Sequence, residues 1–175
     1  AERSHAEGQW CTDWPAPPAD WRYHGIELMQ EEVARARIAF GAHTDATLAA
    51  RAEILAGDIR TADFPAADAV ILLDVLHYLE PDAQVAVLRR VRDALSPSGC
   101  LLLRIGDADG GLRFRISNWV DLAVLWARGH GRARLHCRPL AGWLALLTDL
   151  GFDTTAMPMS HNTPFANVLL VARPR

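Results

Sequence analysis

Three acidic side chains occupy positions at which a sheet protein can bind a nucleoside. Glu27, Asp58 and Asp74 each follow a short apolar run that is typical of a strand. In parallel sheets, ligands bind beyond the carboxyl ends of the strands, and an acid there can accept hydrogen bonds from both hydroxyls of a ribose. Each acid can instead cap the turn or helix that follows it. Their recurrence after successive strands favours a nucleoside site.

Apolar neighbours of these acids extend the predicted cofactor site. Asp58 can accept a hydrogen bond from an adenine amino group while Ile59 packs on the ring. Leu28 and Leu73 adjoin the other two acids and are assigned to the same site. The predicted cofactor-binding residues are Glu27, Leu28, Asp58, Ile59, Leu73 and Asp74.

The candidate catalytic residues are His77 and Tyr78, just after the third apolar run. A histidine can take a proton from a substrate hydroxyl near neutral pH, and Tyr78 could support it. The alternative is a histidine that starts a helix and packs on the surface.

The glycine-rich segment 106–111 is expected to form an active-site loop in which Asp107 faces the substrate. It resembles a calcium-binding loop in part, but the twelfth position from Asp107 is Asn118 and not the glutamate that such loops require. We therefore predict no calcium site here.

A second substrate-facing candidate is Arg134, which lies among histidines, a cysteine and further arginines. The spacing of His130, His136 and Cys137 matches no standard zinc pattern, and the arginines would repel a cation. No metal is predicted. Arg134 either faces an anionic part of the substrate or belongs to a solvated loop.

Trp119 is the third substrate-facing candidate. It lies seven positions before Trp126, which places both indoles on one face of a predicted helix. Such a pair serves either as a packing stripe or as an aromatic cover over a flat or acyl substrate.

Strands and helices that alternate along the chain must position these residues. Apolar runs with almost no polar interruption indicate strands covered on both faces, and the alternation predicts an α/β fold with a largely parallel sheet and helices on both faces. Residues 1–20 are expected to be an irregular arm, and residues 21–175 one domain. The predicted strands are 23–28, 52–56, 69–73, 100–105, 152–157 and 167–172; the predicted helices are 31–40, stopped by Gly41, then 81–95, 114–128 and 139–150, with a turn at 96–99.

Composition narrows the possible partners. The chain has 175 residues, and its formal net charge of −3 gives no electrostatic reason to expect nucleic acid, whose binders usually have a strongly basic face. All eighteen basic residues are arginine, and this absence of lysine is typical of a GC-rich bacterial genome. Three distant cysteines indicate neither a disulfide framework nor a zinc cluster and favour the reduced cytoplasm. No apolar window reaches the length of a membrane span, so we expect a soluble cytoplasmic protein with no membrane partner.

Four segments together resemble class I, Rossmann-like S-adenosylmethionine-dependent methyltransferases. The resemblance implies S-adenosylmethionine as cofactor, an acid on its ribose and an antiparallel last strand. It also implies in-line attack of a substrate nucleophile on the sulfonium methyl, for which the protein supplies orientation and desolvation. The segments are YHGIEL with EVARAR (23–28 and 32–37), GDI (57–59), DAVILLDVLHYL (68–79) and LSPSGCLLL (95–103).

One part of the family pattern is missing. The family's first strand and glycine-rich cofactor loop should precede Trp21, and nothing in residues 1–20 matches them. In the family, that strand lies in the middle of the sheet. The chain is then a fragment of a longer protein, a degenerate homologue, or a chain whose arm or neighbour fills the gap, although prolines in the arm oppose a central strand.

The leading functional hypothesis is methyl transfer to a small-molecule acceptor, for which a hydroxyl of an aromatic or acyl compound is a candidate. A binding protein that keeps the fold without catalysis is the main alternative. A nicotinamide-dependent oxidoreductase also places an acid on a ribose, but its glycine motif is absent as well.

Overall fold

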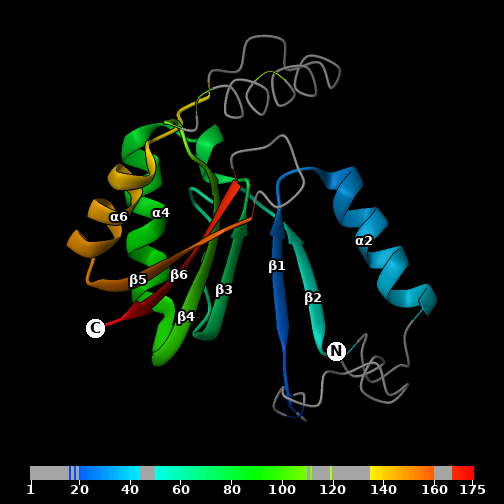
Figure 1. Cartoon of the computed structure of the whole chain (residues 1–175). Coiled ribbons are helices and arrows are strands. Elements are labelled where there is room, and N and C mark those ends of the chain that lie inside the picture. Colours follow the sequence, from blue (N-terminus) through cyan, green and yellow to red (C-terminus); the bar gives the residue numbers. More distant parts are fainter. Residues whose placement is uncertain are drawn as a thin grey trace. The chain divides into compact units, whose positions relative to one another are not determined.

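Two compact units make up the chain, residues 1–62 and residues 63–175. The structure is a computed structural model that describes residues 16, 18, 20–43, 50–109, 111, 119, 135–159 and 167–175 (Figure 1). The predicted arm and the predicted helix 114–128 fall almost wholly outside these residues. Among the described residues, no helix has the length and apolar character that crossing a membrane requires.

The first unit is a two-stranded parallel sheet with one helix. Strand β1 (Tyr23–Glu27) pairs with β2 (Ala52–Ala56), and α2 (Gln30–His43) connects them. Glutamates in the first turn of α2 suit the positive end of the helix dipole. The helix continues past Gly41, where the sequence predicted its end, because Gly41 does not adopt the left-handed conformation that ends helices.

Arg37 of α2 covers the outer edge of β2. Tyr23 N donates to Arg51 O, and Gly57 N donates to Glu27 O, so alternate residues of β2 face β1. The carbonyl of Ile54 therefore points away from β1. It accepts hydrogen bonds from Nε and Nη2 of Arg37 at 3.2 and 2.7 Å.

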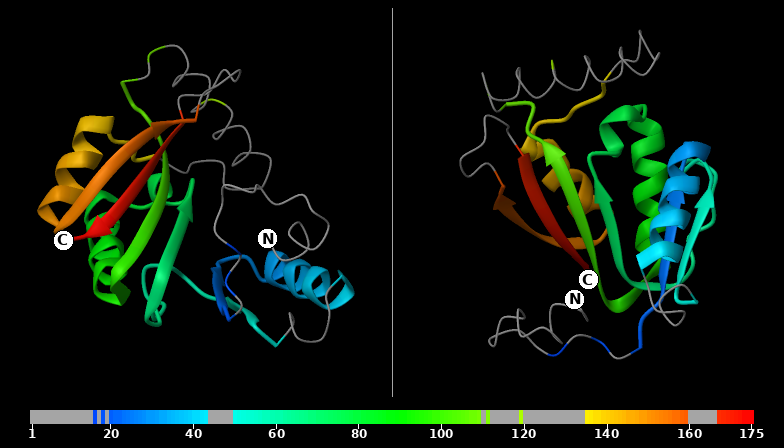
Figure 2. Two further views of the ribbon diagram at one scale, coloured as in Figure 1. Left: turned by 60° about the horizontal axis from the view of Figure 1, so that its bottom comes forward. Right: turned by 90° about the vertical axis from the view of Figure 1, so that its right-hand side faces the viewer.

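The second unit contains a four-stranded sheet in the order β3-β4-β6-β5. Strands β3 and β4 are parallel, and β6 is antiparallel to both β4 and β5 (Figure 2), which confirms the predicted antiparallel last strand. The elements are β3 (Ala67–Leu73), the short 3₁₀ helix η1 (Leu76–Tyr78), α4 (Pro81–Ala94), β4 (Leu95–Gly106), α6 (Leu140–Asp149), β5 (Phe152–Pro158) and β6 (Asn167–Pro174).

Helices α4 and α6 lie side by side against the four-stranded sheet (Figures 1 and 2). Pro81 opens α4 at a position where its missing N–H costs no hydrogen bond, and Gly151, with φ of +81°, follows the end of α6. The buried side chains of the second unit form its core: Leu72, Leu76, Val87, Leu88, Val91, Leu95, Leu101, Leu103, Ile105, Trp143, Leu147, Phe152, Leu170 and Ala172.

The predicted turn at 96–99 belongs to the first part of β4. Ala67 lies opposite Leu95 and Ala69 opposite Cys100, so the intervening residues of β4 form a bulge. Gly99 is required there, because a Cβ atom would lie 3.0 Å from the carbonyl oxygens of both Asp68 and Ser96.

The α/β fold predicted from the sequence is confirmed, with two sheets rather than one in the described residues. Among these residues, β1 pairs with β2 alone and β3 with β4 alone.

Candidate functional site

In the first unit, the carboxyl ends of β1 and β2 bring Glu27 close to residues 57–59. Gly57 N donates to Glu27 O at 2.9 Å. The half-buried Glu27 carboxylate accepts a hydrogen bond from Met29 N through Oε1 at 2.9 Å. Its second oxygen has no hydrogen-bond partner among the described residues, so this carboxylate can receive a ligand hydroxyl.

Asp58 is held by Arg60. The Arg60 guanidinium reaches both carboxylate oxygens at 2.5 to 3.0 Å, and its backbone N–H donates to Oδ1 at 2.8 Å. These hydrogen bonds, first from the side chain and then from the backbone, lower the pKa of Asp58. The contacts match the turn-capping alternative. A role of Asp58 and Ile59 in binding adenine stays a prediction.

In the second unit, Asp74 follows β3 and pairs with Arg104 of β4. Asp74 has φ of +56°, and its Oδ1 accepts a hydrogen bond from Nε of Arg104 at 3.0 Å, with a second contact between Oδ2 and Nη2. The hydrogen bonds to Asp74 raise the pKa of Arg104, which stays charged. Leu73 is 45% exposed, and Leu28 of the first unit is 69% exposed.

His77 lies in η1 and lines a small pocket of about 10 Å³, enough for about one water molecule. Its imidazole lies against the ring of Tyr78, with 4.1 Å between the ring centroids. Arg104, Cys137 and Trp143 line the same pocket. Nε1 of Trp143 is buried and has no hydrogen-bond partner among the described residues.

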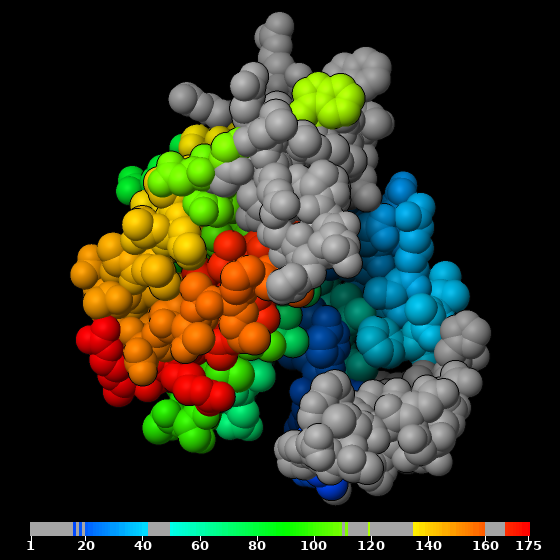
Figure 3. Space-filling view, viewed as in Figure 1, coloured from blue at the N-terminus to red at the C-terminus, as the bar shows by residue number. Residues whose placement is uncertain are grey.

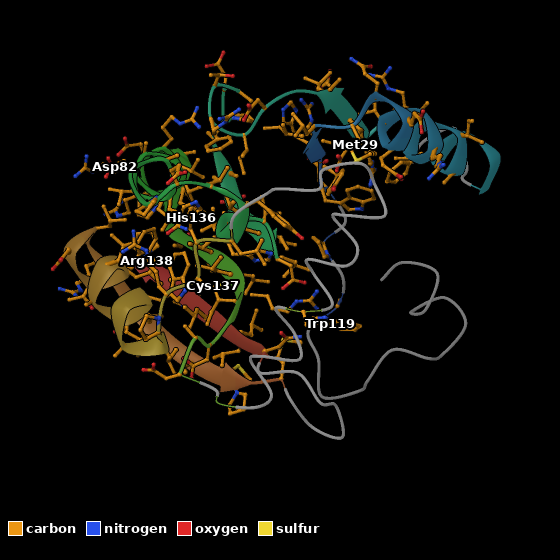
Figure 4. The ribbon with its side chains drawn as sticks, turned by 90° about the horizontal axis from the view of Figure 1, so that it is seen from above. Met29, Asp82, Trp119, His136, Cys137 and Arg138 are labelled. Carbon is orange, nitrogen blue, oxygen red and sulfur yellow. The ribbon has the colours of Figure 1, made fainter. Side chains whose placement is uncertain are left out.

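Residues 135–139 lie along η1 and the start of α4. His136 N donates to His77 O at 2.8 Å, and Figure 4 shows His136 and Arg138 near α4. The buried Gln84 of α4 donates to His136 O at 2.8 Å and accepts from Nε of Arg138 at 2.7 Å. Sequence reasoning missed Gln84, because a polar residue in an amphipathic helix is normally assigned to the surface. It placed Arg138 among arginines that either face an anionic part of the substrate or belong to a solvated loop, and did not predict its bond to Gln84.

The remaining candidates have different surroundings. Oδ1 of Asp107 accepts hydrogen bonds from Leu140 N and Asp109 N at 3.0 and 3.1 Å, which ties the loop after β4 to the start of α6. Trp119 is 71% exposed, and Arg134 lies outside the described residues. Their roles in binding substrate stay predictions. On the face shown in Figure 3, β5 forms part of the outer surface. Met157 of this strand is half exposed.

The described residues contain no cluster of three or more histidine, cysteine or acidic side chains that could hold a metal ion. Two of the carboxylates described above pair with arginines, Asp58 with Arg60 and Asp74 with Arg104.

Comparison with known proteins places these features in a family. A family profile described as a methyltransferase domain matches residues 7–101. The chain is 36% identical over 87 residues to carboxy-S-adenosyl-L-methionine synthase of Chromohalobacter salexigens and 34% identical to that of Pseudomonas fluorescens. These matches cover 50% and 47% of this chain but only 31% and 33% of the relatives. The chain thus spans about a third of their length.

Solved structures share the fold over most of the chain. The mitomycin 7-O-methyltransferase MmcR has a TM-score of 0.69 at 24% identity, covering 88% of this chain and 42% of its own. The S-adenosylmethionine-dependent methyltransferase SibL has a TM-score of 0.65 at 26% identity, with 88% and 44% covered. An O-methyltransferase from neocarzinostatin biosynthesis, solved with S-adenosylmethionine and a naphthoic acid, has a TM-score of 0.63 at 22% identity, with 88% and 42% covered.

These findings agree with the family resemblance and the cofactor predicted from the sequence, and they give no support to a nicotinamide-dependent enzyme. The profile match extends over more than half of the residues, from the N-terminal region through β1, α2, β2, β3 and α4 into β4. The chain therefore belongs to the methyltransferase domain family.

Proposed function

We propose that the protein containing this chain transfers a methyl group from S-adenosylmethionine to a hydroxyl oxygen of a small aromatic or acyl molecule. The placement of Glu27 carries the cofactor part of the proposal. Its half-buried carboxylate ends β1 within the family match and keeps one oxygen without a described partner. The acceptor class is supported by the neighbours, several of which are O-methyltransferases.

The residues present fit a nucleoside. Glu27 would accept hydrogen bonds from the ribose hydroxyls, and Asp58, kept ionised by Arg60, would accept one from the adenine amino group. Leu28, Leu73 and Asp74 are the further predicted contacts. When bound, S-adenosylmethionine supplies the electrophilic methyl group.

His77 is the proposed general base. Its backbone is held in η1, and its Nε2 atom is buried beside a pocket that Arg104 also lines. Because Arg104 is paired with Asp74, its charge is largely offset at that point. The imidazole would take the proton of the acceptor hydroxyl, and Tyr78 would pack against the ring.

Calorimetry with S-adenosylhomocysteine tests the cofactor site. The complete gene product should bind it, and Glu27→Ala should weaken binding at least about tenfold, since a charged hydrogen-bond partner is worth roughly 1.5–3 kcal/mol. Glu53→Ala is the matched control, because Glu53 lies on the neighbouring strand β2 and contacts His24 instead. A folded wild-type protein that binds nothing would favour the non-catalytic alternative.

The base is tested by His77→Ala. The turnover number kcat should fall by about 10²- to 10⁴-fold, the usual contribution of a general base, with S-adenosylhomocysteine affinity unchanged. His24→Ala, in β1, serves as the control histidine and should keep its activity. An unchanged kcat in His77→Ala would remove His77 from the mechanism.

A second candidate function is chemistry on the cofactor itself, which the similarity to carboxy-S-adenosyl-L-methionine synthases favours. Mass spectrometry after turnover separates the two. Methyl transfer accumulates S-adenosylhomocysteine, whereas the second function needs a second substrate that donates a carboxyl group and yields a carboxylated S-adenosylmethionine.

A further inference from the structure

The amide of Gln84 is fully buried in the first turns of α4, and both its NH₂ group and its oxygen form hydrogen bonds. Its Nε2 lies 3.1 Å from Leu76 O, 3.0 Å from Leu79 O and 2.8 Å from His136 O, and its Oε1 accepts from Nε of Arg138 at 2.7 Å. The reversed amide would put an oxygen against three carbonyl oxygens and an NH₂ group against a guanidinium. The orientation of the side chain is therefore determined by its neighbours.

These bonds enclose His77. Gln84 donates to the carbonyl of Leu76, the residue before His77, and to that of Leu79, two residues after His77. The carbonyl of His77 itself accepts from His136 N. Leu76 is also fully buried. The backbone that carries the imidazole is thus held on both sides.

The segment 135–139 is tied to α4 and α6 by further contacts. Nη2 of Arg138 donates to Pro81 O at 3.3 Å, and its guanidinium lies 5.7 Å from the centroid of the Trp143 ring. Nε2 of His136 lies 3.1 Å from a carboxylate oxygen of Glu80. Gln84 joins this segment to η1, although the two are more than 50 residues apart in sequence.

We propose that Gln84 is a positioning residue for His77, holding η1 against segment 135–139 so that the imidazole meets the acceptor hydroxyl. This inference rests on the proposed function of His77. Loss of the amide would remove the donor that three carbonyls share, of which Leu76 O would keep its bond from Leu79 N, and η1 would shift to satisfy the others. A displacement of about 1 Å in a reacting group can cost about 100-fold in rate.

The test is Gln84→Met in the complete gene product, since methionine has a similar volume and no donor. We expect kcat to fall about 10- to 100-fold while the KM for S-adenosylmethionine changes less than about threefold. In a His77→Ala background, Gln84→Met should cause no further loss of kcat, because the two residues act as one unit. Additive losses would overturn the proposal.

Val91→Ala is the control for a purely structural effect. Val91 is buried in the same helix two turns later, so its truncation should lower the melting temperature and leave kcat unchanged in the folded protein. The imidazole NMR signals of His77, assigned with His77→Ala, should move in Gln84→Met and stay in place in Val91→Ala. Unmoved signals in Gln84→Met would contradict the positioning role even if no acceptor is methylated, which separates this failure from failure of the proposed function.

Discussion

Arg60 controls the ionisation of Asp58. In Arg60→Ala the pKa of Asp58 should rise back towards its ordinary value of 3.8, because the side-chain hydrogen bonds that lower it are gone. Carboxyl carbon chemical shifts followed through an acid titration measure this. Arg35→Ala, which removes a comparable exposed arginine paired with Glu32, should leave Asp58 unchanged.

The same pair sets a pH dependence of stability. Because the folded-state pKa of Asp58 lies below its unfolded value, the contribution of the pair is fully present above about pH 4 and is lost as the pH falls through the lowered value. Arg60→Ala should therefore be less stable than wild type at neutral pH and equal to it in strong acid. A difference that persisted in strong acid would point to packing instead.

Single residues also show how far the sequence could predict the site. Glu27, Asp58 and Asp74 could be placed at strand ends because apolar runs reveal where strands stop. Their partners could not be predicted in the same way. Arg104 meets Asp74 from 30 residues away, through the register of β3 and β4, and register is a property of the folded sheet.

Two glycines should respond in opposite directions to substitution by alanine. Gly99→Ala should destabilise the protein by about 1–3 kcal/mol, because the new Cβ would crowd two backbone oxygens at 3.0 Å in the β4 bulge. Gly41→Ala should stabilise α2 by about 0.5–1 kcal/mol, since nothing lies within 4 Å and alanine favours helix. Urea unfolding measures the change in the free energy of unfolding for both variants. If Gly99→Ala also stabilised the protein, the backbone oxygens would not be as close to Gly99 as the structure shows.

Elements were predictable to different degrees. Strand β2 has the predicted limits, and α4 begins at the predicted proline, because apolar periodicity and helix-start signals are local. The start of β4 was missed. The sequence SPSG is typical of a turn, but pairing of Leu95 with Ala67 extends the strand to include it. Gln84 was missed because its burial depends on a segment that is distant in sequence.

The buried apolar side chains are distributed unevenly over the molecule. Among the described residues, Val33 is the fully buried apolar side chain of the first unit, and the other buried apolar side chains belong to the second. A unit that buries little apolar surface gains less hydrophobic stabilisation than one with a larger core. The two units should therefore differ in local stability.

Hydrogen exchange measures this difference. Peptides from residues 23–43 should exchange earlier than those from β4 and β6, whose strands are paired within the four-stranded sheet. S-adenosylhomocysteine should slow exchange in residues 23–43 if Glu27 binds the ribose. Identical protection in both units would show that they open together.

The guanidinium of Arg37 makes the two outer edges of the two-stranded sheet unequal as sites for pairing with another strand. An incoming strand at β2 must compete with Arg37 for the outward carbonyl of Ile54, whereas the described residues place no such competitor on the outer edge of β1. Lateral assembly of this sheet is therefore one-sided. We therefore expect β2 to remain an edge strand of this sheet, and any additional strand should pair with β1.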